Sequence, residues 1–196
     1  MTKLNPLESA VVTVLGTGYS PVAPATVASA AVCAAIWFVP ALLTWPWFLL
    51  VIPLTWWGAL LSRKAMDAFD VVTSGQVAAL RRPNPHQGDP DQVVFDELNG
   101  QWITLIAAYH TIAGYAVAFV AFRGFDILKP LGIRWFETIG QRPRGPSGPK
   151  TGLQDDKWKG WGVMLDDVVA GIYGAIALRI LHRALAPFLP GWYTGL

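Results

Sequence analysis

The chain has 196 residues, of which 53% are hydrophobic and 14% charged, and it contains ten tryptophans. Its length suits one domain rather than two, and its charged fraction is well below the roughly one quarter of ordinary soluble domains, so we expect contact with lipid. The formal net charge is only +2, and no nucleic-acid partner is expected.

The first long uncharged region extends from Ser9 to Ser62 and contains no Asp, Glu, Lys or Arg. Prolines divide it into pieces, because proline breaks a helix. Residues 27–39 are rich in alanine and predict a closely packed helix. Residues 41–61 are bulkier and end at Arg63 and Lys64, which predicts a kinked membrane helix with a basic end. Its aromatic belt would consist of Trp45, Trp47, Trp56 and Trp57.

A second uncharged region covers residues 98–122. Within it, residues 102–122 are long enough to span a bilayer and are closed by Arg123. The alternative is a very apolar helical bundle that only touches the membrane. No strand alternation persists, so we expect an all-α fold, a single compact domain over residues 1–196 with two or three membrane-embedded helices.

Two segments predict loops, at about residues 81–90 and 141–159, because both are dense in proline, glycine and charge. Basic residues gather in the connections and at the ends of the apolar segments, which by the positive-inside tendency face the cytoplasm. The single cysteine, Cys33, lies in an alanine-rich run, where a small buried residue is expected rather than a nucleophile.

Two acidic doublets, Asp96-Glu97 and Asp166-Asp167, each follow a run of apolar residues. A buried ionised carboxylate costs several kcal/mol unless a cation or a hydrogen-bond donor meets it. Each doublet alone could simply cap a helix. Four acids in two similar apolar settings favour a divalent cation, and oxygen-only ligands favour Mg²⁺ over zinc.

Helix geometry indicates how each doublet could present its oxygens. If a helix opens near Asp96, then Asp96 and Asn99 share one face, and Glu97 lies about 100° round the helix. Asp166 and Asp167 are expected at the start of a second helix that continues to about residue 181.

A third segment, residues 123–134, supplies positive charge at the end of the second apolar region. It places Asp126 among Arg123, Lys129 and Arg134. Arginine can bind a phosphate through two hydrogen bonds and lysine can act as a point charge, so the segment suits an anionic headgroup. A basic stop that only touches lipid headgroups is the alternative reading.

Four short blocks of the chain form a characteristic set. The first reads LGTGYSPVAPAT over residues 15–26. The central block is Asp89-Pro90 followed by VVFDE over residues 93–97 and Gly100-Gln101-Trp102. The third block is FDILKPLGI over residues 125–133, and the last is GVMLDDVVAG over residues 162–171. Taken together and in this order, the four blocks resemble the phosphatidylglycerophosphatase A family over the whole length, with Ala25 where the family has glycine.

This resemblance implies a helical, Mg²⁺-dependent lipid phosphatase that converts phosphatidylglycerophosphate to phosphatidylglycerol and phosphate. It implies a bacterial cytoplasmic membrane protein with its active site on the cytoplasmic side, an anionic phospholipid as substrate and a homodimer as one possible assembly. By position, the implied metal ligands are Asp96, Glu97, Asp126, Asp166 and Asp167. Asp96, Glu97 and Asp167 are the candidate catalytic residues, and the candidate substrate contacts are Lys129, Arg123, Arg134 and Thr26.

Within this set we expect Glu97 to act as the general base that takes a proton from water, because metal-bound carboxylates are poor bases. If glycine is needed at position 25 for a positive φ, Ala25 would perturb the first loop. Two other classes of protein stay open: a small ion-coupled membrane transporter, since acids in apolar helices often mark ion paths, and a catalytically inactive lipid-binding homologue.

Overall fold

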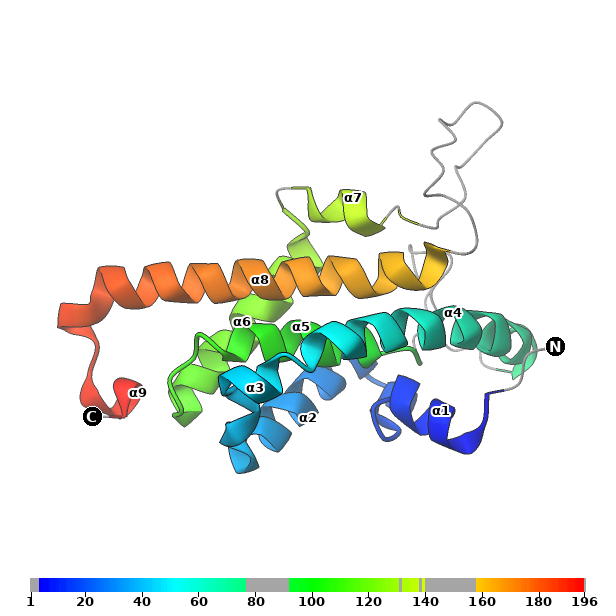
Figure 1. Ribbon diagram of the computed structural model, residues 1–196, viewed down its shortest axis with the longest axis horizontal. Coiled ribbons are helices and arrows are strands. Elements are labelled where there is room, and N and C mark those ends of the chain that lie inside the picture. Colours follow the sequence, from blue (N-terminus) through cyan, green and yellow to red (C-terminus); the bar gives the residue numbers. More distant parts are fainter. Residues whose placement is uncertain (1–3, 77–91, 131, 138, 140–157, 196) are drawn as a thin grey trace.

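The protein is an elongated bundle of helices whose two ends of chain lie at opposite ends of its long axis (Figure 1). The computed structural model describes residues 4–76, 92–130, 132–137, 139 and 158–195, and these contain no strand. The all-α prediction is therefore confirmed for the described residues. In chain order the elements are α1 (Pro6–Val12), η1 (Thr17–Tyr19), α2 (Pro24–Phe38), η2 (Pro40–Leu43), α3 (Trp45–Phe48), α4 (Val51–Gln76), α5 (Phe95–Leu105), α6 (Ile112–Leu128), α7 (Ile133–Glu137), α8 (Lys159–Leu185), η4 (Ala186–Phe188) and α9 (Gly191–Thr194).

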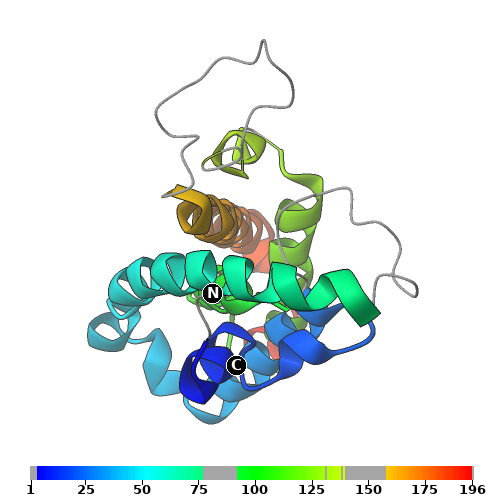
Figure 2. The same cartoon turned by 90° about the vertical axis from the view of Figure 1, so that its right-hand side faces the viewer.

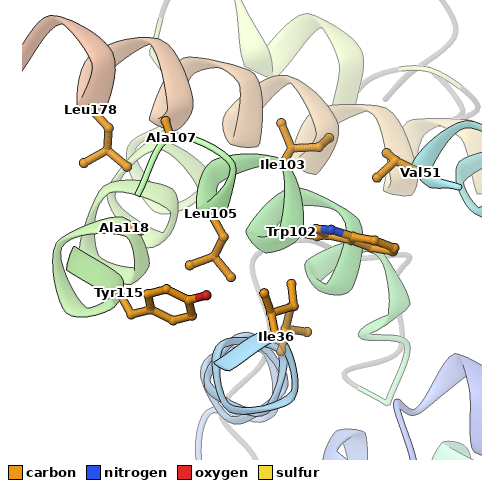
Figure 3. Packing of buried hydrophobic residues seen from close by; sticks show 10 residues of the cluster. Ile36, Val51, Trp102, Ile103, Leu105, Ala107, Tyr115, Ala118 and Leu178 are labelled. Atoms are coloured by element: carbon orange, nitrogen blue, oxygen red, sulfur yellow. The ribbon is translucent and has the colours of Figure 1, made fainter. Parts of the chain in front are cut away.

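Helix α5 is the centre of the bundle, with α8 on one side and α2 on the other (Figures 1 and 3). It also packs against α4 and α6. Its apolar residues Trp102, Ile103 and Leu105 are at most 6% exposed and pack with Ile36 of α2 and Leu178 of α8. Because α5 is surrounded by other helices, its polar side chains are buried along with its apolar ones. Glu97, Asn99, Gln101 and Thr104 of α5 are all buried.

Helices α5 and α8 cross at a pair of glycines. A Cβ atom on Gly171 would lie 2.4 Å from the carbonyl oxygen of Gly100, and one on Gly100 would lie 2.6 Å from the carbonyl oxygen of Asp167. One turn later, the Thr104 hydroxyl donates to the carbonyl oxygen of Gly171 at 3.1 Å. Later residues of α5 thus meet later residues of α8, so the two helices run in the same direction.

The predicted kinked helix over residues 41–61 corresponds to η2, α3 and the first part of α4. Among the described residues, the stretch Trp45–Ala65 is the one helix long and apolar enough to cross a membrane, and 28% of it is buried. Its exposed residues Ile52, Trp56 and Leu60 are four apart and share a face of α4. An apolar face turned outward is consistent with the predicted lipid contact.

The predicted second span over residues 102–122 is wrong, because the chain turns between α5 and α6. Thr111 caps α6, its side chain accepting a hydrogen bond from the backbone N–H of Gly114 at 3.0 Å. The Thr111 hydroxyl donates in turn to the carbonyl oxygen of Tyr193 at 2.7 Å. Residues 102–105 are buried within the bundle, so their hydrophobicity reflects packing against protein. The expectation of two or three membrane helices is reduced to one candidate in the part of the chain described.

The predicted loops at residues 81–90 and 141–159 lie outside the described residues, except that residues 158 and 159 belong to the start of α8. Helix α8 therefore begins well before the acidic doublet Asp166-Asp167, and the prediction that this doublet opens the helix is wrong. A Cβ atom on Gly160 would lie within 2 Å of the carbonyl oxygen of Ala59. The first turn of α8 thus packs directly on the backbone of α4, and the two helices lie next to each other in Figures 1 and 2.

We expect Gly171→Ala to lower the free energy of unfolding by about 1–3 kcal/mol, because the added methyl group forces α5 and α8 apart. Gly124→Ala in α6 is the matched control, since its Cβ atom would meet no atom within 4 Å. Alanine there should be neutral or raise the stability by about 0.5–1 kcal/mol through its helix propensity. Chemical denaturation of the purified proteins in detergent measures both values, and equal stability of the two variants would contradict the close crossing.

Candidate active site: a carboxylate cluster between three helices

Seven of the predicted site residues, five acids and two cationic side chains, converge where α5, the end of α6 and α8 meet. Asp96 and Glu97 stand in the first turn of α5, both about one turn before the crossing at Gly100 and Gly171. Asp166 and Asp167 lie just before that crossing on α8. Because the two helices run in the same direction, the doublets are brought to the same side of it. Arg123 and Asp126 are added from the last turns of α6.

Arg123 is the main counter-charge of the cluster. Its Nη1 atom donates to both carboxylate oxygens of Glu97, the longer contact being 2.6 Å, and it lies 2.9 Å from Oδ2 of Asp126. The side chains of Arg123 and Asp126 are each 13% exposed, and that of Glu97 is 7% exposed. An ion pair with so little exposure is screened weakly by solvent. Arg123 therefore joins α5 to the end of α6.

Lys129 supplies the second counter-charge from an unusual backbone position. It ends α6 with φ 44° and ψ 55°, in the left-handed region, which non-glycine residues rarely adopt. Its Nζ atom donates to Oδ2 of Asp166 at 2.8 Å. This backbone conformation turns the chain sharply after α6, and the Lys129 side chain binds Asp166 of α8.

Burial and mutual repulsion set the protonation of the acids. Burial, with the nearby charge of Asp126, raises the pKa of Glu97 to about 7 even though Arg123 opposes the shift. Burial also raises the pKa of Asp96 and of Asp167 well above the usual range, and the charges of the other acids in the cluster add to both shifts. Burial alone would lower the pKa of Arg123, but Glu97 and Asp126 raise it. The acids are thus close enough to influence one another electrostatically.

Several polar atoms of the cluster are buried and have no hydrogen-bond partner within the described part of the chain. They are the acceptors Oδ1 of Asp96 and Oδ2 of Asp167 and the donor Nε of Arg123. Buried polar atoms are nearly always paired, and leaving one unpaired costs about 1–3 kcal/mol. Unpaired acceptors beside an unpaired donor indicate a site that a cation and an anionic group could complete together.

The chemistry of the donors suits a hard divalent cation such as Mg²⁺, since every candidate ligand is a carboxylate oxygen. Among the described residues, however, no three Asp, Glu, His or Cys side chains stand ready to hold a metal ion. Arg123 and Lys129 occupy oxygens of Glu97, Asp126 and Asp166 instead. Asp96 and Asp167 fit a cation best, because each retains an unpaired buried oxygen.

Ser29 is a residue of this site that the sequence did not single out. It lies on α2, is fully buried, and donates its hydroxyl to Oε2 of Glu97 at 3.1 Å and to the carbonyl oxygen of Ala25 at 2.9 Å. Its only sequence signal is its position one turn after Thr26 on the same helix. Thr26 itself is half-buried on α2. Arg134 belongs to α7, but its side chain lies outside the described residues.

The glycine-rich N-terminal motif, residues 15–26, packs against the segment that leads into α5. A Cβ atom on Gly18 would lie 2.3 Å from the carbonyl oxygen of Gln92, just before α5. The backbone N–H of Val94 donates to the carbonyl oxygen of Val12 at 3.1 Å. The motif therefore holds the start of α5 and with it Asp96 and Glu97. Asp89 and Pro90 of the central motif lie outside the described residues.

Ala25 does not create the strain that a missing glycine could cause. It lies inside α2, and the positive φ of 46° belongs to Ala23, the residue before the helix. Cys33 of the same helix is half-buried, whereas its alanine-rich setting predicts a buried residue. Burial raises the pKa of its thiol to about 12, which disfavours the thiolate that a nucleophile needs.

Comparison with known proteins gives a consistent set of relatives. The family model of phosphatidylglycerophosphatase A matches residues 10–145. A Bacteroides thetaiotaomicron protein provisionally named phosphatidylinositol-3-phosphatase is 37% identical over 168 residues, which cover 84% of this chain and 87% of the relative. Phosphatidylglycerophosphatase A of Escherichia coli is 31% identical over 161 residues, which cover 82% of this chain and 74% of the relative. No solved structure matches the chain.

We expect Arg123→Gln to lower the free energy of unfolding by about 3–5 kcal/mol, because it leaves Glu97 and Asp126 buried without their counter-charge. Adding Glu97→Gln to that variant should restore part of the loss, since one of the two stranded charges is then removed. Denaturation of the two single variants and the double variant gives the coupling energy between the residues. Losses that simply add would contradict the ion pair.

Proposed function

Because the chain belongs to the phosphatidylglycerophosphatase A family, we propose that it hydrolyses the terminal phosphomonoester of phosphatidylglycerophosphate, leaving phosphatidylglycerol and phosphate. The observation that carries the proposal is the meeting of Asp96, Glu97, Asp126, Asp166 and Asp167 with Arg123 and Lys129 between three helices. Carboxylates beside phosphate-binding cations are what a metal-assisted phosphatase needs. The apolar stretch Trp45–Ala65 supports an attachment to the membrane that contains the lipid.

The positively charged side chains of the cluster, Arg123 and Lys129, are suited to binding the phosphate group of the substrate. Arg123 has a buried Nε without an acceptor, so a phosphate oxygen could take that position while the Nη1 contacts persist. Lys129 would have to share its charge between Asp166 and the substrate. Their positive charge would offset the negative charge that grows on the phosphoryl oxygens during the reaction. Arg134 and Thr26 stay as further predicted contacts.

We propose that Asp96 and Asp167 hold Mg²⁺. Asp126, Asp166 and Glu97 would become further ligands if Arg123 and Lys129, which now bind their oxygens, moved away. When bound there, the ion would polarise a phosphate oxygen and lower the pKa of a water molecule. Filling the site would also satisfy the two unpaired carboxylate oxygens, Oδ1 of Asp96 and Oδ2 of Asp167.

We retain Glu97 as the predicted general base. In the reaction the oxygen of water forms the new bond to phosphorus, and the bond between phosphorus and the lipid oxygen breaks. The Glu97 carboxylate takes a proton from the water, and the departing lipid oxygen takes up a proton to become the free hydroxyl of phosphatidylglycerol. A pKa near 7 suits that role near neutral pH. Because both oxygens of Glu97 now accept hydrogen bonds from Arg123 and Ser29, the carboxylate must give up one of them to act.

A second substrate is favoured by one observation. The Bacteroides relative, whose name refers to phosphatidylinositol 3-phosphate, covers as much of this chain as the Escherichia coli relative and is 37% identical compared with 31%. Both substrates are phosphomonoesters on a glycerophospholipid headgroup. A phosphomonoester of a phosphoinositide is therefore the alternative substrate for the same site.

We expect the purified protein to release inorganic phosphate from short-chain phosphatidylglycerophosphate in the presence of Mg²⁺ and to lose this activity in a chelator. Short-chain phosphatidylinositol 3-phosphate, assayed in parallel, ranks the two substrates by kcat/KM. Activity that is undiminished by the chelator would contradict the proposed metal. No release from either lipid would favour the inactive lipid-binding homologue or the transporter.

We expect Glu97→Gln to lower turnover by about 100-fold or more, the usual contribution of a general base, while the fold is retained. Glu8→Gln is the matched control, because Glu8 pairs with Lys64 at the surface, away from the cluster. Phosphate release and thermal unfolding are measured on both variants. Near-normal turnover of Glu97→Gln in a folded protein would assign the base to another acid, with Asp167 the next to test.

A further inference from the structure

A basic groove lies on the C-terminal half of α8, away from the carboxylate cluster. It has a volume of about 370 Å³ and is formed by Arg179, His182 and Arg183 of α8 together with Ile106 and Tyr109 from the turn between α5 and α6. Figure 1 shows this part of α8 extending past α3 toward α9. Family matching ends at residue 145, so the α8 side of the groove lies beyond the matched segment.

The two arginines of the groove have no counter-charge among the residues that the structure describes. They are one helical turn apart and therefore share a face of α8. Both are exposed, and neither forms a hydrogen bond or an ion pair with any described residue. The chain has no Asp or Glu from Val168 to its last residue, and none between Leu98 and Phe122, the stretch that contains the other wall. Two adjacent guanidinium groups in such a setting attract an anion, and arginine suits phosphate.

The groove continues into an apolar one. A neighbouring hollow of about 390 Å³ shares Arg179 and Arg183 and is otherwise lined by Ala175, Ile176 and Ile180. Ile176 is 50% exposed and Ile180 is 63% exposed. A ligand that fills both hollows must combine an anionic group with a hydrocarbon chain. Free phosphate would use only the first hollow.

The height of the groove along the bundle agrees with a lipid headgroup. Gly160 of α8 packs against Ala59 and Arg63 of α4, and the helices run in opposite directions from there. At a rise of 1.5 Å per residue, Arg179 lies about 28 Å along α8 from Gly160. Trp45 lies about 27 Å from Arg63 in the same direction, if the kinked stretch that leads into α4 is taken as straight. Arg179 is thus near the level of the tryptophan end of the apolar helix. Exposed Phe188 and Trp192 follow α8 in sequence, and aromatic side chains gather at headgroup level.

We propose that this groove binds an anionic glycerophospholipid, with its phosphate between Arg179 and Arg183 and an acyl chain along Ile176 and Ile180. The lipid would be a resident of the membrane that anchors the C-terminal half of α8 at headgroup level. The binding needs no chemistry from the carboxylate cluster, so it stands independently of the proposed reaction.

The test is lipid binding by the full-length protein in detergent, followed by native mass spectrometry. Phosphatidylserine is the probe because it is anionic and has no phosphomonoester, and zwitterionic phosphatidylcholine is the comparison. We expect the wild type to bind phosphatidylserine more tightly than phosphatidylcholine. Arg179→Gln combined with Arg183→Gln should weaken phosphatidylserine binding by about tenfold or more, since both positive charges that face the lipid phosphate are then lost.

Arg63→Gln removes one positive charge from an exposed site on α4 outside the groove, and is the control for the single variants Arg179→Gln and Arg183→Gln. Ile176→Gln tests the apolar part and should weaken lipid binding without removing charge. The proposal is overturned if the arginine double variant binds phosphatidylserine as the wild type does, or if Arg63→Gln weakens binding as much as the single variants do. Full displacement of the lipid by inorganic phosphate would also overturn it, because a soluble anion would then be the ligand. Since the readout requires no turnover, an inactive enzyme leaves this test intact.

Discussion

The close contact between Gly100 of α5 and Gly171 of α8 positions the two acidic doublets next to each other. With a Cβ atom at either position, backbone atoms would come within 2.6 Å, so the two helices can meet this closely only because both residues are glycine. Thr104 secures the contact by donating to the carbonyl oxygen of Gly171. The shared direction of the helices then places Asp96-Glu97 and Asp166-Asp167 on the same side of the crossing, although about seventy residues separate them in the chain.

The cluster beside this crossing is stabilised by positively charged side chains, but two of its buried carboxylate oxygens have no hydrogen-bond donor among the described residues. The positive charge of Arg123 offsets the negative charges of Glu97 and Asp126, and that of Lys129 offsets the negative charge of Asp166. Asp96 and Asp167 each keep a buried oxygen without a donor. A protein that were only packing its helices could replace such a cluster with apolar side chains at little cost or with a gain in stability. Retaining several acids at the centre of an apolar bundle is therefore consistent with selection for a ligand, and the family places that ligand among phosphorylated lipids.

Two features of the fold could not be predicted from local sequence, and both concern what surrounds an apolar segment. Residues 102–105 have the composition of a membrane helix, but other helices cover them, and hydropathy does not distinguish protein from lipid as the apolar partner. The N-terminus of α8 was predicted too late because glycines such as Gly160 weaken a helix in isolation, whereas here the absence of a side chain allows contact with α4. Ser29 was missed because a serine in an alanine-rich helix has no signal of its own until Glu97 is placed beside it.

The helical class, the apolar stretch ending near Arg63 and the acidic and basic residues of the site can be predicted from the sequence alone, because periodicity, length and residue type are local properties. The family can also be identified from it, through four short blocks in a fixed order. Which of these residues meet depends on the tertiary fold: Glu97 binds Arg123 and Ser29, and Lys129 binds Asp166. Arg179 and Arg183 have no partner among the described residues. Those pairings follow from the directions in which α5, α6 and α8 cross, which depend on contacts between residues far apart in the chain.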